Sequence, residues 1–133
     1  MKNENLTKAV NKLCEDLTTT SHEAYPTLAK YNNYTAEAGR KFIKIIKQDN
    51  FNGDMSESVW GFINIGEFTK ERKMANCVKS VTFKEGDVLM ANGWRAPALN
   101  TPRGNLFDGY VINSRTMYGP AYASSNRTLW KDL

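Results

Sequence analysis

The stretch from residue 93 to 110 holds the side chains in this sequence that are best suited to binding a ligand. Its residues, GWRAPALNTPRGNLFDGY, supply two guanidinium groups, two aromatic rings before Tyr110 and two amides, and Asn92 precedes it directly. Guanidinium groups pair with phosphate oxygens, and aromatic rings interact with planar or cationic groups. These residue types predict contact with a planar, phosphorylated ligand. The candidate ligand-binding residues are Asn92, Trp94, Arg95, Arg103, Asn105 and Phe107, with Phe83 before the stretch and Arg115 and Tyr118 after it.

The same stretch also fits an ordered surface loop. It contains prolines and glycines that neither a helix nor a central strand accepts together, namely Gly93, Pro97, Pro102, Gly104 and Gly109. In this interpretation Trp94 anchors the loop by packing, and Arg103 satisfies loop carbonyls. Loops often carry function but also serve as connections. Both interpretations stay open on the sequence.

The sequence lacks the motifs of the common catalytic and metal sites. No glycine spacing matches a dinucleotide or Walker phosphate loop, and neither G-x-S-x-G nor H-E-x-x-H occurs. Cys14 and Cys77 lie far apart, and His22 is the single histidine. We therefore predict no catalytic residue, no metal site and no cofactor, and we expect a protein that is not an enzyme.

Length and charge narrow the class of protein. A chain of 133 residues is expected to form a single domain, 1–133, with residues 1–33 helical and 40–133 forming a sheet, the binding loop and a tail. Eighteen basic and fourteen acidic residues give a net charge of +4. This mild excess favours an anionic partner but makes nucleic acid unlikely. Without a signal peptide or a long apolar run, a cytoplasmic protein with no membrane partner is predicted.

The spacing of apolar residues predicts an α+β fold. Leu6, Val10, Leu13 and Leu17 form one stripe on a helix over residues 4–19, and a second helix is expected from about 26 to 31. β-branched and aromatic runs then predict strands at 41–46, 58–65, 77–83, 88–91 and 110–115, with a charged connection at 66–76. The prediction is two N-terminal helices followed by a mostly antiparallel sheet of four to five strands.

The C-terminal tail, residues 117–133, is rich in aromatic side chains. Tyrosine and tryptophan are seldom left together in solvent, so the tail is expected to pack on the domain or on a second subunit. An exposed sheet edge would also need a cover. We therefore expect a homo-oligomer, a dimer or higher.

Five segments together resemble a family of small phage-encoded proteins. They are Lys41–Ile45 in a lysine-rich first strand, Ser58–Ile63 in an aromatic second strand, Gly86–Leu89, the W-[KR]-x-P-A motif at Trp94–Ala98 and the R-[GY]-N motif at Arg103–Asn105. Within that family, the layout of helices followed by a sheet resembles the anti-Thoeris sponge branch. Members of that branch bind the cyclic ADP-ribose isomer made by a bacterial TIR-domain immune enzyme and hold it without cleavage.

The resemblance implies a phage immune-evasion protein that works in the cytoplasm of an infected bacterium and sequesters a signalling nucleotide. The chemistry of the candidate residues agrees with this, since Arg95 and Arg103 suit a diphosphate and Trp94, Phe83 or Phe107 suits a base. Asn92 or Asn105 would then read the edge of the base. Two alternatives remain open: inhibition of a host protein by direct protein–protein contact, and weak binding of nucleic acid.

Overall fold

The computed structural model describes residues 4–24, 32–51, 54–73, 75, 78–99, 102–108, 110, 112 and 131–132. Its elements are α1 (Glu4–Ala24), β1 (Asn32–Ala38), β2 (Phe42–Phe51), β3 (Asp54–Asn64), β4 (Phe68–Lys73), β5 (Val78–Phe83), β6 (Asp87–Leu89), β7 (Gly104–Asn105), the 3-10 helix η2 (Leu106–Asp108) and β8 (Lys131–Asp132). Strands β1, β2, β3, β6 and β7 form an antiparallel five-stranded sheet in that order, and β4, β5 and β8 form a smaller one. The predicted α+β class and five-stranded antiparallel sheet are confirmed.

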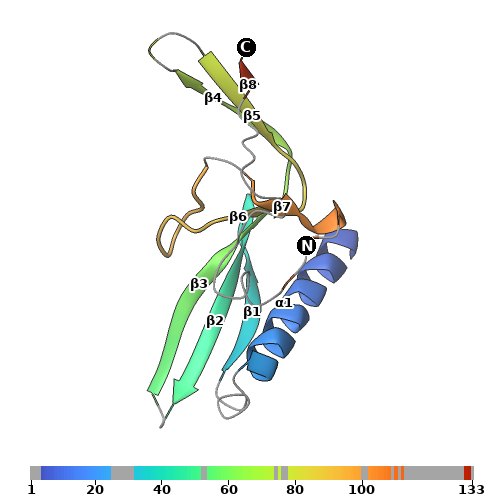
Figure 1. The fold of residues 1–133 in the computed structure, drawn as a ribbon, viewed down its shortest axis with the longest axis vertical. Coiled ribbons are helices and arrows are strands. Elements are labelled where there is room, and N and C mark those ends of the chain that lie inside the picture. The colour runs from blue at the N-terminus through green and yellow to red at the C-terminus, as the bar shows by residue number, and fades with distance from the viewer. Residues whose placement is uncertain are drawn as a thin grey trace.

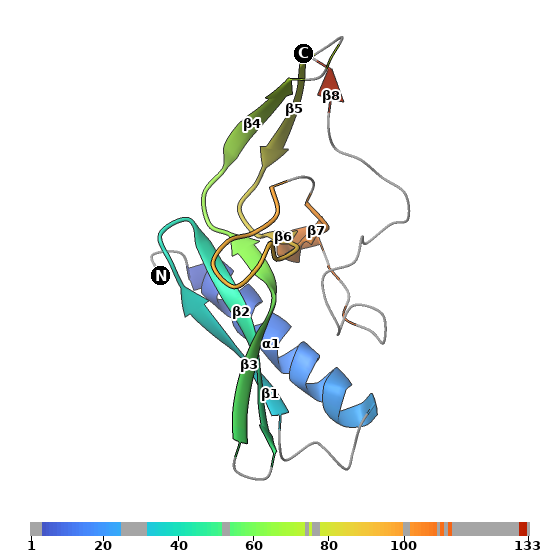
Figure 2. The same cartoon turned by 90° about the vertical axis from the view of Figure 1, so that its left-hand side faces the viewer.

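The larger sheet separates α1 from the loop that follows β6. Figure 1 shows α1 along one side of the strands and the loop at residues 90–99 on the other side. Figure 2, turned by 90°, places the same loop in front of β2 and β3 and α1 behind them. The β4–β5 ribbon extends beyond the end of the larger sheet in both views. The sheet thus has a helix-covered face and an opposite face, which we call the outer face.

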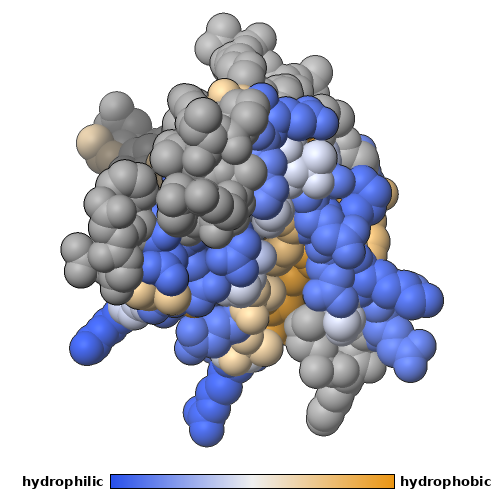
Figure 3. All heavy atoms as spheres, turned by 90° about the horizontal axis from the view of Figure 1, so that it is seen from below, coloured by the Kyte–Doolittle hydropathy of each residue, from blue (hydrophilic) through white to orange (hydrophobic). Residues whose placement is uncertain are grey.

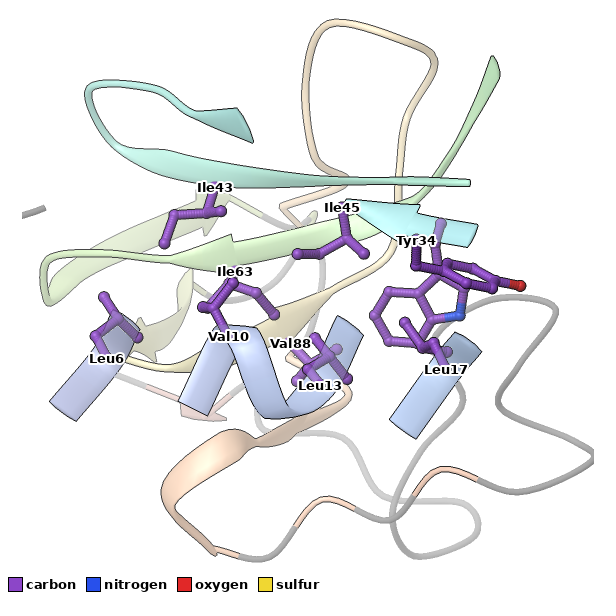
Figure 4. Close-up of a cluster of buried hydrophobic side chains, with 10 residues drawn as sticks. Leu6, Val10, Leu13, Leu17, Tyr34, Ile43, Ile45, Ile63 and Val88 are labelled. Atoms are coloured by element: carbon purple, nitrogen blue, oxygen red, sulfur yellow. The ribbon is translucent and has the colours of Figure 1, made fainter. Parts of the chain in front are cut away.

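The helix-covered face holds the main hydrophobic core (Figure 4). The predicted stripe of α1 is confirmed, because its four members are 0–3% exposed. They pack against strand residues Tyr34, Ile43, Ile45, Trp60, Ile63 and Val88. Burying each aliphatic side chain of this size contributes about 1.5–3 kcal/mol, so the stripe fixes the helix on the sheet.

Helix α1 continues five residues past its predicted end at residue 19. The run of threonine and serine at residues 18–21 favours an end there, since hydroxyls compete for backbone hydrogen bonds. Instead the Thr18 hydroxyl donates to the Cys14 carbonyl within the helix, at 2.8 Å, and accepts the Tyr34 N–H of β1 at 3.2 Å. His22 therefore lies in the last turn of the helix.

The predicted pair of N-terminal helices is wrong in the described part of the chain, which has one α-helix at this end. The second predicted helix, at 26–31, lies outside the described residues. Strand β1 begins at Asn32, a segment for which no strand was predicted, and pairs with β2 over its full length, from Asn32 opposite Asp49 to Ala38 opposite Ile43.

The outer face carries a second core, which joins the two sheets. Phe62, Val81, Phe83 and Leu89 form its buried centre, and Phe68 of β4 packs against them. The rings of Phe68 and Phe83 stack at a centroid distance of 4.9 Å. The segment 66–76 was predicted to be a charged connection, but Phe68–Lys73 is strand β4. Phe68 at its start explains the difference, because this partly buried ring packs on Phe42 of β2 and Phe83 of β5 despite the charges that follow it.

A bulge in β3 changes which side chains face α1. Ile45 pairs with Gly61 but Ile46 pairs with Val59, so Trp60 is an extra residue in the strand. In such a bulge two residues of one strand stand opposite a single residue of the other, so the alternation of faces shifts by one residue at Trp60. Trp60 therefore joins the core under α1, while Val59 packs with the outer core.

The end of the molecule that carries the β2–β3 hairpin has a mostly hydrophilic described surface. Viewed from the end of the β2–β3 hairpin, hydrophilic residues dominate and apolar residues show as a narrow strip between them (Figure 3). No described helix is long and apolar enough to cross a membrane.

The last predicted strand, at 110–115, is described only at Tyr110 and Ile112, and neither residue lies in a strand. Most of the aromatic tail lies outside the described residues.

Candidate functional site

The outer face carries a pocket of about 250 Å³ beside the loop after β6. Its floor is aromatic, formed by Phe42 and Phe62, whose rings meet edge to face at 6.4 Å. The end of β1, the turn into β2 and Arg95 of the loop after β6 also line it. The lining residues are Glu37, Ala38, Gly39, Arg40, Lys41, Phe42, Lys44, Phe62 and Arg95.

Strand pairing fixes the order of side chains across this face. Glu37 of β1 lies directly opposite Lys44 of β2, and Lys44 lies directly opposite Phe62 of β3. Directly opposed residues of antiparallel strands project to the same side, about 4.5–5.5 Å apart at Cβ. A carboxylate, an ammonium and an aromatic ring therefore form one row across three strands.

The pocket is strongly cationic. Arg40, Lys41, Lys44 and Arg95 supply four positive charges and Glu37 one negative charge, a local balance of 4 − 1 = +3. Salt bridges among the described residues occur elsewhere, between Lys12 and Asp16 and between Lys47 and Asp49. Among the same residues no side-chain hydrogen bond or salt bridge engages the ionic groups of Glu37, Arg40, Lys41 and Arg95. Such uncompensated positive charge favours an anion.

Lys44 is the one pocket cation with a strong side-chain contact in the described structure. Its Nζ lies 4.2 Å from the centre of the Trp94 ring, within the range of a cation–π interaction. This contact draws the ammonium toward the loop, and no salt bridge joins Lys44 to Glu37 although the register places them opposite one another. Trp94 stays 44% exposed, so one part of its ring remains open to a ligand.

Short backbone hydrogen bonds hold the loop that carries Trp94 and Arg95. The Asn92 N–H donates to the Ala96 carbonyl at 2.8 Å, and the Ala98 N–H donates to the Met90 carbonyl at 2.7 Å. Gly93 has a φ of 87°, in the left-handed region that favours glycine, and so permits the tight turn before Trp94. The loop is therefore a closed turn that presents an indole and a guanidinium side by side.

No protein-family model, no curated protein and no solved structure matches this chain. The resemblance to phage-encoded proteins thus remains a prediction. The evidence for function comes from the residues around the pocket.

The structure brings three of the predicted site residues to this region. Arg95 lines the pocket, Trp94 contacts its lysine, and Asn92 lies exposed in the same turn. Arg115 and Tyr118 lie outside the described residues. The other four predicted residues are Phe83, Arg103, Asn105 and Phe107, and none of them lines the pocket.

Phe83 and Arg103 have structural contacts. Phe83 is fully buried in the core between the sheets, so its ring is closed to a ligand, contrary to the stacking role predicted for it. Arg103 lies near β6, where its backbone N–H donates to the Val88 carbonyl at 2.7 Å and its Nη2 lies 3.6 Å from the Met90 sulfur. These contacts agree with the alternative role of Arg103 as a residue that holds the loop.

Asn105 and Phe107 stabilise the turn before β6. The Asn105 amide donates to the Glu85 carbonyl at 2.8 Å and to the Asp87 carboxylate at 2.9 Å, and its oxygen accepts the Phe107 N–H. Burial raises the pKa of the Asp87 carboxyl, and the bonds from Asn105 and from the Lys84 N–H oppose that rise. Asn105 thus compensates a buried acid, and no base-reading role is needed to explain it.

Sequence reasoning missed four lining residues that carry charge, namely Glu37, Arg40, Lys41 and Lys44. Lys44 could have been found, because it stands between Ile43 and Ile45 in a predicted strand, a signal that it lies on the face opposite to theirs. Lys41 gave no such signal, because it precedes β2 and lies three residues from Lys44. Glu37 and Arg40 could not be placed, because no strand was predicted at 32–38.

The lining residues include none of the usual hydroxyl, thiol or imidazole groups of a catalytic site. Serine, cysteine and histidine are absent from the pocket wall, and no described cluster of acidic, cysteine or histidine residues could hold a metal ion. Cys14 lies on α1, across the sheet, where burial raises the pKa of its thiol to about 11. At neutral pH this thiol is protonated and unreactive. The pocket can therefore bind an anion by charge and stacking.

Gly86 is expected to tolerate no side chain. Its φ is +85°, and a Cβ would lie 2.8 Å from a Phe107 ring carbon. We expect Gly86→Ala to lower the free energy of unfolding by about 1–3 kcal/mol, measured by urea denaturation. Gly66→Ala is the matched control, since a Cβ there meets nothing within 4 Å, and its effect should stay within about 1 kcal/mol. Equal stability of the two variants would contradict the packing of Phe107 on this turn.

Proposed function

We propose that this protein binds a phosphorylated small molecule with a planar base in the cationic pocket and sequesters it without cleavage. The observation that carries the proposal is the set of four cations around one pocket, of which only Lys44 has a side-chain partner among the described residues. A nucleotide is the ligand class that uses both the charge and the exposed indole of Trp94.

A cyclic ADP-ribose isomer is the specific ligand that the proposal names. Its diphosphate would pair with Arg95 and with the cations of the β1–β2 turn, and its adenine would stack on Trp94. The pocket, at about 250 Å³, lies slightly below the usual range for drug-sized ligands of about 300–1,000 Å³. The base is therefore expected to extend out of the pocket along the loop. An immune-evasion role agrees with the sequence resemblance to phage-encoded sponge proteins.

Sequestration requires affinity and stoichiometry in place of turnover. A sink that competes with a receptor needs a dissociation constant in the nanomolar range, about −12 kcal/mol. Tight binding of the ground state opposes catalysis, which requires stronger binding of the transition state. The lining residues, which include no serine, cysteine or histidine, support the same conclusion. A second subunit that covers the pocket would add to the affinity, and light scattering tests for the oligomer.

The protein should therefore capture a cyclic ADP-ribose isomer and return it intact. We expect isothermal titration to saturate at a fixed molar ratio, and chromatography after heat denaturation to recover the cyclic molecule unchanged. Arg95→Ala, heated in the same way, serves as the control for ligand carried over without binding. Recovery of linear ADP-ribose in amounts that exceed the protein and grow with time would contradict sequestration. If added salt abolishes the binding of every anion to the same extent, the contacts are non-specific charge contacts. That result would favour the alternative of weak nucleic-acid binding.

A further inference from the structure

The cationic pocket contains one carboxylate, and its position calls for an explanation. Glu37, on β1, lines the same pocket as Arg95 of the loop after β6. A pocket that bound only phosphate would gain from a neutral residue here, because a carboxylate repels phosphate. Glu37 is exposed and forms no salt bridge with the residues that the structure describes.

The strand register makes the unpaired state of Glu37 unexpected. Lys44 lies directly opposite Glu37 on the neighbouring strand, which is the position where cross-strand ion pairs form. The Lys44 ammonium instead lies over the Trp94 ring at 4.2 Å. The contact of Lys44 with Trp94 of the loop after β6 thus leaves the Glu37 carboxylate without its cross-strand partner, as a hydrogen-bond acceptor at the pocket.

We propose that Glu37 accepts hydrogen bonds from the vicinal hydroxyls of a ribose. This inference rests on the proposed function and adds which part of the ligand the β1 side of the pocket recognises. A carboxylate reads a ribose diol because both of its oxygens accept hydrogen bonds and the two hydroxyls both donate. In this arrangement the sugar lies over Phe42 and Phe62, and its 5-phosphate extends toward Arg95 and Lys41. The carboxylate then meets hydroxyl donors and the cations meet the phosphate.

The arrangement predicts selectivity for ribose over deoxyribose. A site built to bond a hydroxyl rejects an analogue that lacks it, because the acceptor is left unpaired beside the ligand. We expect wild-type protein to bind ribose 5-phosphate at least about tenfold more tightly than 2-deoxyribose 5-phosphate, a ratio typical of one lost hydrogen bond to a charged group. Inorganic phosphate should bind more weakly than either sugar phosphate.

Titration of these three probes against Glu37→Ala tests the role of the carboxylate. The variant should lose the preference for ribose 5-phosphate and should bind inorganic phosphate at least as well as the wild type does, since a repelling charge is removed. Glu15→Ala is the control, because it removes one exposed carboxylate from α1, on the far side of the sheet. It should keep the wild-type ratio between the two sugar phosphates.

Each result has one meaning. Equal binding of the two sugar phosphates by the wild type, or a preference that survives in Glu37→Ala, would overturn the role of Glu37 and leave the anion pocket intact. Failure of the wild type to bind any of the three probes would overturn the pocket itself, and the proposed function with it. Glu37→Gln keeps one acceptor oxygen and the size of the side chain, so it should retain part of the preference for ribose 5-phosphate. This result would exclude a folding defect as the cause of the loss in Glu37→Ala.

Discussion

Arg95→Glu is expected to weaken binding of a cyclic ADP-ribose isomer by at least about 100-fold without lowering the melting temperature. A hydrogen bond to a charged group contributes about 1.5–3 kcal/mol, and the reversed charge adds repulsion, so a loss of about 3 kcal/mol or more follows. Arg95 is exposed and has no side-chain partner among the described residues, so the fold does not depend on it. Isothermal titration at fixed ionic strength measures the effect.

Lys8→Glu is the matched control for Arg95→Glu. It makes the same change in net charge on an exposed position of α1, on the opposite side of the sheet. The affinity of this variant for the ligand should stay within about threefold of the wild type, because an exposed charge farther than a Debye length of about 10 Å is screened.

Arg103→Glu tests which of the two arginines predicted from the sequence binds the ligand. A larger loss of binding for Arg103→Glu than for Arg95→Glu would show that the pocket is not the binding site.

Phe83→Ala is expected to lower the free energy of unfolding by about 3–5 kcal/mol, the largest effect on stability among the substitutions considered. The side chain is fully buried between the sheets, in contact with the stacked ring of Phe68 at 4.9 Å. Its removal leaves a cavity that several rigid rings cannot fill. For a chain of this size the melting temperature should fall by roughly 10–20 °C, measured by thermal unfolding.

A second pair of variants distinguishes a core role of Phe83 from ligand stacking. Phe83→Leu keeps most of the apolar volume, so it should unfold at a temperature closer to the wild type and bind ligand normally. Met55→Ala, at a position 61% exposed, should change stability by less than about 0.5 kcal/mol. Loss of ligand binding in a folded Phe83→Leu protein would restore the stacking role that the sequence suggested.

Prediction from the sequence succeeded where one periodic pattern decided the structure. The leucine and valine stripe of α1 was sufficient, because its period of 3.6 matches no other element. The strands around Ile43 and Ile63 were predicted for a similar reason, since β-branched residues form alternating runs there. Both cases depend on residues close in sequence.

Prediction failed where a distant partner decided the structure. Strand β1, NNYTAEA, has few strand-forming residues, and it exists because β2 supplies a complete register for it. Strand β4 reads as a solvated charge run, yet Phe68 is held by Phe83. In both cases the contact that stabilises the strand joins segments that no local pattern connects.

The candidate site was predicted only in part for the same reason. Trp94 and Arg95 were found because the motif places them in one irregular loop. Glu37 and Lys41 also line the pocket, and their presence there depends on the fold, which brings the turn between β1 and β2 to the same pocket as that loop. Residue types alone also could not separate Arg95, which faces the pocket, from Arg103, which lies by β6.

The sheet that separates α1 from the pocket allows specificity to diverge while the fold is kept. Side chains of β2 alternate between the two faces, so Ile43 and Ile45 stabilise the helix while Lys44 between them lies in the pocket. Substitutions more than about 7–10 Å apart usually have additive effects. Changes at Glu37, Lys44 or Arg95 should therefore alter ligand preference at little cost in stability. Chains with the same helix and sheet could therefore differ in ligand preference through substitutions in the pocket alone.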